Sequence, residues 1–316
     1  MKKILIFPSG TKNNEYLNRM GEIFRKAGYD TVTLSLKEVL RSIRSGQKFA
    51  YLNWIENQTR QRGLVGLGLI FGMLCLLKIL GYKIIWVQHN KVSHNVSGRY
   101  ARGLNAFSMY IIKRFSDYIV CHGKRFSKLS GANYLPHPTY KESLIECRDI
   151  DSLRSGFQHY YLMFGRMQPY KKIEEFLLSC SNCNLIIAGK FDSQYLKYVE
   201  SVISSSEANV KVINRFISDE EVEGLVKLSS GVVVTNDGAS SVVSGVVYHI
   251  LSLGGTVFTS SKTLYNEMAP LRNFYLIDSW DKINIKDRAS DTNEDLFYLN
   301  SDVKIITAFE KMVSEI

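Results

Sequence analysis

The segment TNDGASSVVSGVVYHILSLGGTVFTS, Thr235 to Ser260, follows an apolar run, GVVV, at Gly231–Val234. It opens with small and polar residues, continues as an apolar helical pattern, and passes through Gly254-Gly255 into a second β-branched strand. Small residues at a strand-to-helix turn admit a ligand close to the backbone, and a helix N-terminus offers unbonded N–H groups to an anion. The layout is that of a phosphate site in a parallel α/β sheet. An ordinary crossover that binds nothing has the same layout, so this segment alone leaves both interpretations open.

Strands and helices are expected to alternate along the whole chain, which predicts parallel sheets covered by helices on both faces. With 316 residues the chain is long enough for two domains of about 150 residues each. The expected strands are Lys3–Phe7, Thr31–Leu34, Ala50–Trp54, Lys83–Gln88, Tyr118–Cys121, Tyr160–Phe164, Leu185–Ala188, Val210–Ile213, Gly231–Val234, Thr256–Thr259 and Phe274–Ile277.

The stretch from Tyr134 to Arg148, with Pro136 and Pro138, interrupts this alternation and is the expected linker. We therefore expect an N-terminal domain over residues 1–140, a C-terminal domain over 141–300, and a last helix in 301–316 that returns to the N-terminal domain. Two helix starts carry local signals: Ser218 opens a capping box, and Pro169 stands where a first helical turn begins.

The positive charge is concentrated in the first half. The first 150 residues hold 24 Lys and Arg against 9 Asp and Glu, a balance of +15, and the rest carry −5. Such asymmetry suggests that one lobe faces an anionic surface, either nucleic acid or an anionic membrane leaflet. The basic residues are not interleaved with an RNA-binding signature, which argues against nucleic acid.

The most apolar run is Leu64–Leu77, LVGLGLIFGMLCLL. Its 14 residues are too few for a membrane span, which needs about 20. We expect a buried helix. The alternative is a helix with one face in a bilayer interface, which the flanking cations favour. These cations are Arg60, Arg62, Lys78 and Lys83.

Five scattered cysteines and an N-terminal apolar run too short for a secretory signal favour a reducing cytoplasm. The Cys180–Cys183 pair lacks partners for a zinc site and is expected to be structural. The same is expected of His122, His137 and His159, which have no acidic or cysteine partner at ligand spacing. His89 and His94 have no carboxylate between them, so no metal is expected.

A second anion signal follows the expected strand that ends at Phe164. Gly165 permits a tight turn at the end of this strand. Arg166 and Lys171 lie at the start of the next helix, where the helix dipole disfavours cations unless an anion is bound. The next two strands end in a glycine turn at Gly189 and in the turn Arg215-Phe216-Ile217.

In their order, these turns resemble the C-terminal domain of the GT-B glycosyltransferases. They are "GRxxPxK" at Gly165–Lys171, "IxG" at Ile187–Gly189, "RFIxDEE" at Arg215–Glu221, and the small-residue helix ending in "GGTV" at Gly254–Val257. Three N-terminal segments are similar to bacterial polysaccharide enzymes of glycosyltransferase group 1, or family 4: Asn53-Trp54-Ile55-Glu56, Trp86 to His94, and Leu135-Pro136-His137-Pro138.

The resemblance implies two Rossmann-like, doubly wound α/β domains that face a central cleft, and it implies roles for individual residues. Arg166 and Lys171 would bind the donor diphosphate, and Phe216 and Ile217 would border the base. Ser241, Ser244 and Gly245 would meet the phosphates, and Asp237 would meet a sugar hydroxyl. Gly10 and Gly189 complete the implied donor site. His89 would lie under the reacting sugar, with Glu56 and His94 as candidate general bases.

Two departures stand out. Many retaining members carry two glutamates along the phosphate helix, where this chain has Val242 and His249, which leaves the stereochemical outcome open. The N-terminal loop has Ser9-Gly10-Thr11 where a Gly-Gly pair is common.

The leading hypothesis is therefore a hexosyltransferase of surface polysaccharide synthesis, without metal or other cofactor. It would be cytoplasmic and peripheral on the inner face of the plasma membrane. It would move sugar from a nucleoside-diphosphate donor to a lipid-linked glycan acceptor at an anionic membrane surface. The alternatives are a nucleotide-sugar epimerase on the same fold and a non-catalytic sugar-nucleotide-binding scaffold.

Overall fold

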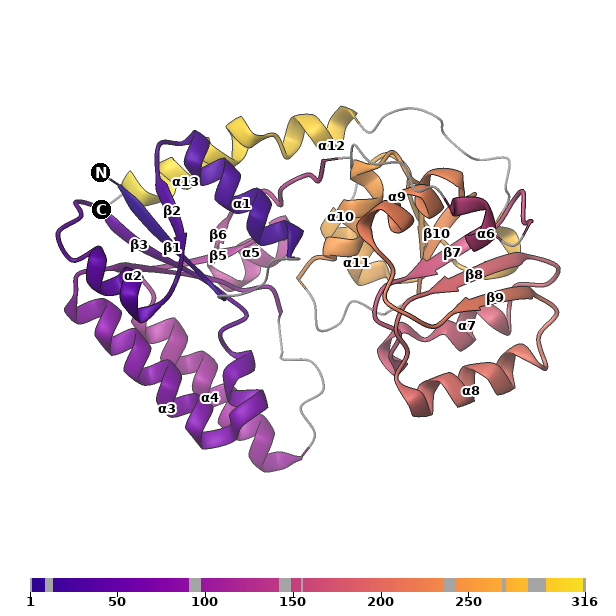
Figure 1. Ribbon diagram of the computed structural model, residues 1–316, viewed down its shortest axis with the longest axis horizontal. Helices are drawn as coiled ribbons and strands as arrows, with labels where there is room; N and C mark the ends of the chain where they lie inside the picture. The colour runs from indigo at the N-terminus through magenta and orange to yellow at the C-terminus, as the bar shows by residue number, and fades with distance from the viewer. Residues whose placement is uncertain are drawn as a thin grey trace. The chain divides into compact units, whose positions relative to one another are not determined.

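The computed structural model describes residues 2–8, 14–90, 98–141, 149–154, 156–235, 242–268, 271–283 and 294–314. The chain divides into two compact units, each built on a six-stranded parallel sheet with helices on both faces (Figure 1). The first unit comprises Met1–Pro138, Ala239–Val243 and Leu299–Ile316, and the second comprises Thr139–Gly238 and Ser244–Tyr298.

The sheet of the first unit has the strand order β2-β1-β3-β4-β5-β6, with every neighbouring pair parallel. The chain reverses direction across the sheet between β1 and β3, which is therefore the topological switch point. The strands are β1 (Lys3–Phe7), β2 (Asp30–Thr33), β3 (Lys48–Asn53), β4 (Lys83–Val87), β5 (Tyr118–Cys121) and β6 (Asn133–Tyr134). The helices are α1 (Glu15–Lys26), α2 (Leu36–Arg41), α3 (Asn57–Ile79), α4 (Arg99–Phe115), α5 (Lys124–Ser130) and α13 (Asp302–Ser314).

The sheet of the second unit has the order β12-β11-β10-β7-β8-β9, again all parallel. Counted from β7, this is the 3-2-1-4-5-6 order of dinucleotide-binding folds, with the switch point between β7 and β10. The strands are β7 (Tyr161–Phe164), β8 (Asn184–Ala188), β9 (Asn209–Ile213), β10 (Gly231–Val234), β11 (Val257–Thr259) and β12 (Phe274–Leu276). The helices are α6 (Ile150–Arg154), α7 (Ile173–Leu177), α8 (Ser193–Ile203), α9 (Asp219–Leu228), α10 (Gly245–Ser252), α11 (Lys262–Met268) and α12 (Glu294–Leu299), with 3-10 turns η1 (Pro169–Lys171) and η2 (Trp280–Lys282).

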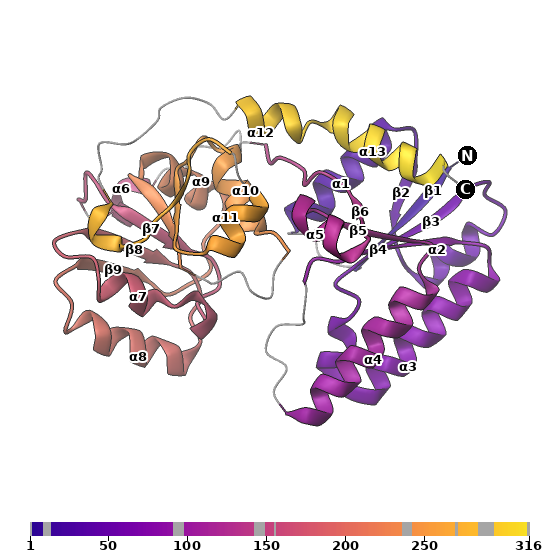
Figure 2. The same ribbon diagram turned by 180° about the vertical axis from the view of Figure 1, so that it is seen from behind.

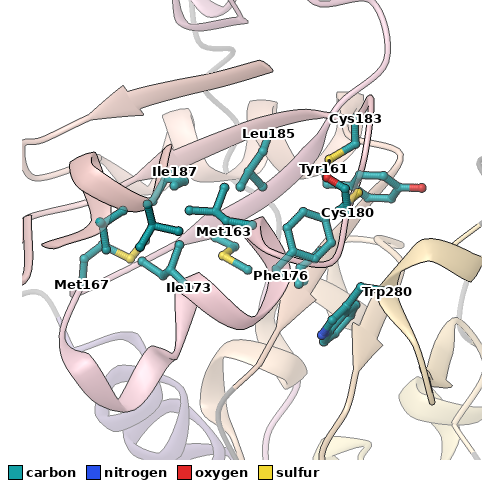
Figure 3. Close-up of a cluster of buried hydrophobic side chains, with 14 of the residues drawn as sticks. Tyr161, Met163, Met167, Ile173, Phe176, Cys180, Cys183, Leu185, Ile187 and Trp280 are labelled. Carbon is teal, nitrogen blue, oxygen red and sulfur yellow. Dashed lines mark hydrogen bonds between the residues drawn. The ribbon is translucent and has the colours of Figure 1, made fainter. Parts of the chain in front are cut away.

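The core of the second unit lies between β7, β8 and the helices on one face of that sheet (Figure 3). Met163 and Ile187 project from neighbouring strands towards Ile173. Phe176 meets Trp280 edge to face, with ring centroids 5.4 Å apart. Cys180 and Cys183 are buried in this cluster as free thiols. The alternating apolar residues of the strands thus bury one face against α7.

The C-terminal helix α13 belongs to the first unit. Its Phe309 is fully buried, with its ring centroid 4.7 Å from that of Phe24 and 6.1 Å from that of Phe49. At the start of α13, Asp302 accepts hydrogen bonds from Arg19 and Lys26 of α1. Figure 2 shows α13 running alongside α1 on one side of this sheet.

The expected fold class, two Rossmann-like parallel α/β domains, is confirmed, and each expected strand is present within one or two residues of its bounds. The capping box is also confirmed, because Ser218 and Glu221 bond each other's backbone at the start of α9. Strand β6 was not expected, and Pro169 opens a 3-10 turn before α7. The boundary between the units falls after Pro138, and 239–243 groups with the first unit.

One expectation is wrong. Residues 64–77 form part of α3, as predicted, but the helix is not a buried one, because its most apolar window is only 22% buried. It is the one described helix with the length and composition of a membrane span. Ile70, Leu74 and Leu77 pack on the sheet, whereas Leu64, Val65 and Leu69 are exposed. An apolar residue pattern that covers all sides of a helix does not reveal which side the fold covers.

Candidate functional site

Ligands of open parallel sheets bind at the carboxyl ends of the strands, beside the switch point. The two sheets therefore define two candidate sites, one at the ends of β7 and β10 and one at the ends of β1 and β3.

In the second unit, the turn after β7 is held against the end of β8 by glycine. Gly165 has φ 105° and its N–H donates to the Ala188 carbonyl. A Cβ on Gly189 would lie 1.7 Å from the Gly165 carbonyl oxygen. Gly189 is therefore required for the close approach of these two backbones at the ends of β7 and β8.

Lys171 joins this turn to the switch point. Its Nζ donates to the Phe164 carbonyl at the end of β7, over 3.1 Å, and the Thr235 hydroxyl just after β10 donates to the Lys171 carbonyl. Burial lowers the pKa of Lys171 to about 8. Within the described ranges, neither Lys171 nor Arg166 forms an ion pair with a carboxylate. Arg166 is exposed on the same turn and acts electrostatically on Tyr170. The β7–β10 edge thus carries two cations that an anionic ligand would neutralise.

The turn after β9 presents an aromatic ring. Arg215 makes a two-pronged ion pair with Glu221, at 2.9 and 2.6 Å, and Glu221 also accepts from the Ser218 N–H. Held in this way, Phe216 is 71% exposed while Ile217 is buried. The exposed ring of Phe216 could stack on a base, whereas the side chain of Ile217 belongs to the core.

Ser244 is the N-cap of α10, and its hydroxyl accepts from the Val247 N–H. Gly245 is the first residue of this helix. Asp237 and Ser241 lie outside the described residues, so their expected donor contacts have no structural account.

Val242 and His249 occupy the two positions at which the resemblance implies glutamates, and both make other contacts here. The Val242 N–H donates to the His89 carbonyl over 3.0 Å, and its side chain packs on Cys121 and Ala132 in the first unit. The His249 ring lies 5.1 Å from that of Tyr140, and burial lowers its pKa.

In the first unit, one asparagine joins the switch-point strands to a histidine. Asn53 at the end of β3 donates through Nδ2 to the Phe7 carbonyl at the end of β1, over 2.9 Å. Its Oδ1 must then accept the 2.9 Å bond to His89 Nε2. The proton of the neutral imidazole is therefore on Nε2, and Nδ1 carries a lone pair. Trp54, with the unusual φ of 49°, stacks on this ring.

Two further histidines lie beside His89. The His122 Nδ1–H donates to the Leu135 carbonyl, which leaves Nε2 to accept from the Tyr16 hydroxyl at 2.8 Å. His137 likewise donates from Nδ1 to the Pro138 carbonyl. Burial lowers the pKa of His122 to about 4 and holds those of His89 and His137 well below the usual value. Near neutral pH this is a cluster of neutral imidazoles.

The candidate bases are placed differently from one another. Glu56 is 2% exposed, its Oε2 accepts from Trp86 Nε1 at 3.4 Å, and burial raises its pKa. This position at the start of α3 favours a structural role. His94 and Gly10 lie outside the described residues.

Sequence reasoning missed the cluster around His89 because Tyr16, His122 and His137 are far apart in the chain. One signal could have found it. His89 and His122 each directly follow an expected strand, and the carboxyl ends of such strands meet at one edge of a parallel sheet. Among the residues that the structure describes, no group of three or more His, Cys, Asp or Glu side chains could hold a metal ion.

No protein-family model matches the chain, and no curated protein matches it by sequence. Solved structures do match in fold. Anabaena Alr3699/HepE in complex with UDP matches with TM-score 0.63 and 12% identity over 100% of both chains. AviGT4, a glycosyltransferase involved in avilamycin A biosynthesis, matches with TM-score 0.60 and 14% identity over 99% of this chain and 97% of its own.

A third match is the UDP-forming α,α-trehalose-phosphate synthase of Burkholderia xenovorans in complex with glucose-6-phosphate. Its TM-score is 0.59 and its identity 8%, over 100% of this chain and 99% of its own. These neighbours are GT-B glycosyltransferases, and the chain has their two-domain α/β fold.

Proposed function

We propose that the chain is a glycosyltransferase that moves a sugar from a nucleoside-diphosphate donor to a glycan acceptor. The observation that carries this is Lys171, a cation with a burial-lowered pKa at the switch-point edge of β7 and β10, without a carboxylate partner among the described residues. A donor diphosphate supplies the missing negative charge. The fold neighbours include one protein in complex with UDP and with UDP-glucose, which supports a nucleotide-sugar donor.

On the donor side, Lys171 and Arg166 would bind the diphosphate, and Phe216 would stack on the base. The N–H groups at the start of α10, from Gly245 onward, would add hydrogen bonds to phosphate. The hydroxyl oxygen of Ser244 accepts from the Val247 N–H as N-cap, and its O–H would still donate to a phosphate oxygen.

On the acceptor side, the neutral His89 would hydrogen-bond the reacting sugar through the free lone pair of Nδ1, which can accept from a sugar hydroxyl. His94 remains the proposed general base, since its imidazole can take a hydroxyl proton near neutral pH.

We also propose the finer features of the activity: a hexosyl group, an acceptor carried on a lipid, a role in surface polysaccharide synthesis, and a location on the inner face of the plasma membrane. No metal or cofactor is required in this proposal. The membrane location and the lipid-borne acceptor are supported by the +15 charge balance of the first 150 residues, which suits an anionic bilayer.

Calorimetric titration with UDP and other nucleoside diphosphates tests the donor site directly. Binding should be lost or weakened about tenfold or more in Lys171→Met, because a charge-assisted hydrogen bond is worth roughly 1.5–3 kcal/mol. Lys197→Met, which removes an exposed lysine of α8, should bind like the wild type. No binding of any nucleotide by the wild type would refute the proposal. Isomerisation of a nucleotide sugar without acceptor would replace it by an epimerase.

A further inference from the structure

The outer face of α3 and α4 carries several exposed apolar side chains that the donor and acceptor roles leave unused. Both helices pack on the same core cluster, through Ile70, Leu74 and Leu77 of α3 and Ile112 of α4. They lie side by side on one side of the first unit's sheet (Figures 1 and 2). Their unburied sides therefore both point away from this sheet.

On α3 this outward side is apolar throughout most of its length. Leu64, Val65, Leu69, Phe71 and Ile79 are exposed, with Val65 at 68% and Ile79 at 81%. Gly68 and Gly72 lie on the same stripe and are also exposed. Soluble surfaces rarely present so many apolar side chains together unless something covers them.

On α4 the outward side combines aromatic and cationic residues. Tyr100, Phe107 and Tyr110 are exposed. Between and beside them lie Arg99, Arg102, Lys113 and Arg114. Together α3 and α4 contain seven Lys and Arg and no Asp or Glu. Apolar and aromatic residues flanked by cations characterise helices that lie in a bilayer interface.

The helix cannot cross a bilayer in this fold. Gly63, with φ 58° and ψ −133°, breaks α3, so the continuous apolar helix is residues 64–79. At 1.5 Å per residue these 16 residues span roughly 24 Å, against about 30 Å for a hydrocarbon core. The opposite side of the helix also packs on the protein core, through Ile70, Leu74 and Leu77. An orientation parallel to the membrane plane satisfies both constraints.

We infer that the outer face of α3 and α4 docks the chain on an anionic bilayer, with the α3 stripe in the interface and the α4 cations on lipid headgroups. The inference deepens the proposed function, on which it rests for the expectation that a lipid-borne acceptor is met at a membrane. A second copy of the chain is the less suitable occupant, because two surfaces without a single carboxylate on these helices would repel each other.

Vesicle flotation of the full chain tests the inference without nucleotide or sugar. The wild type should float with vesicles of phosphatidylcholine and phosphatidylglycerol, less with phosphatidylcholine alone, and less as salt is raised. The double variant Val65→Asp/Leu69→Asp should lose at least about tenfold in partition for each side chain removed from the interface. The variant Arg102→Gln/Arg114→Gln should lose about fivefold for each cation, and only with anionic vesicles.

The matched control is Leu178→Asp in the second unit, which changes a leucine that is 67% exposed and should float like the wild type. Each variant should retain the thermal unfolding midpoint of the wild type. Equal flotation of wild type and Val65→Asp/Leu69→Asp would overturn the inference. A dimer in lipid-free solution that this double variant dissociates would assign the face to a second copy instead.

UDP titration in the absence of lipid separates the two proposals. If the chain does not float with vesicles but still binds UDP, the membrane-docking inference is wrong. If the chain floats with vesicles but binds no nucleotide, the donor proposal is wrong.

Discussion

The imidazole of His89 stacks on the indole of Trp54, with ring centroids 4.2 Å apart and planes inclined by 16°. Asn53 holds the edge of the same imidazole through Nε2. Trp54 thus fixes the plane of the imidazole ring, and Asn53 fixes its tautomer. Both come from the end of β3, which places His89 at the switch point of the first sheet.

Asn53 is predicted to act as a positioning residue for His89. In Asn53→Ala the ring loses its acceptor, so Nδ1 and Nε2 share the proton and turnover of the donor sugar should fall by about tenfold to a hundredfold. UDP affinity should stay within twofold of the wild type. Nitrogen chemical shifts of labelled histidine report the tautomer directly. An unchanged tautomer, or a loss of UDP binding equal to the loss in turnover, would contradict this assignment.

UDP affinity should fall above pH 8. Free Lys171 has a pKa of about 8 because burial disfavours its charge, whereas a bound diphosphate requires the charged form. Above that pH, binding must recruit a proton, so the affinity should decrease by up to tenfold per pH unit. In Lys171→Arg the guanidinium stays charged, and the calorimetric pH profile should be flat over this range. A wild-type profile equally flat would remove Lys171 from the diphosphate site.

The folded protein should lose stability between about pH 6.5 and pH 4. Burial lowers the pKa of His122 to about 4, whereas an unfolded histidine titrates near 6.5. In that window the unfolded chain binds more protons than the folded one, so acid favours unfolding. The free energy of unfolding should fall by up to about 1.4 kcal/mol per pH unit for this residue, with His137 adding to the slope.

Urea unfolding followed across this window measures the slope. His159→Gln, which changes an exposed histidine, should leave it unaltered. A protein equally stable at both ends of the window would contradict a lowered pKa of His122 in the folded state.

Phe216→Ala should weaken UDP binding without changing stability. The ring is 71% exposed, so its removal leaves no cavity, whereas base stacking on an aromatic ring is worth about 1–3 kcal/mol. A loss of at least about fivefold is expected for UDP, and none for inorganic pyrophosphate, which has no base. Calorimetry with both ligands gives the comparison, and a parallel loss for pyrophosphate would mean that the turn itself had changed.

Gly189→Ala should be among the most destabilising single-methyl additions in the chain. The new Cβ would meet the Gly165 carbonyl oxygen at 1.7 Å, which forces the ends of β7 and β8 apart. We expect a loss of about 3 kcal/mol or more in the free energy of unfolding. Gly156→Ala is the matched control, because its φ of 80° is also left-handed but nothing lies within 4 Å of its Cβ. A cost equal to that of the control would show that the clash relaxes freely.

Much of the fold was predictable because its signals are local. The β-branched strands at Lys3–Phe7 and Gly231–Val234, and the capping box at Ser218, need only their immediate neighbours in sequence. The turn from Gly165 to Lys171 was recognisable for the same reason. Strand β6 was not predicted because its two residues are too few to show a periodic pattern.

The cluster at His89 and the exposed stripe of α3 were not predictable in this way. Tyr16 and His122 are 106 positions apart, and only the parallel strand order brings them together. For Leu64–Leu77, composition indicates a helix that avoids water but does not say whether protein or another apolar phase covers each side. Only the packing of Ile70 and Leu74 on the sheet distinguishes the sides.

The place of Phe309 has a consequence for the order in which the chain matures on the ribosome. Phe24 and Phe49 emerge early, yet the ring that fills the space between them is translated after the entire second unit. A nascent chain stalled near residue 138 would therefore lack Phe309, and the apolar side chains of Phe24 and Phe49 would be accessible to chaperones and proteases. Adding a peptide of residues 299–316 to that stalled fragment should cover these side chains with Phe309 and restore protease resistance.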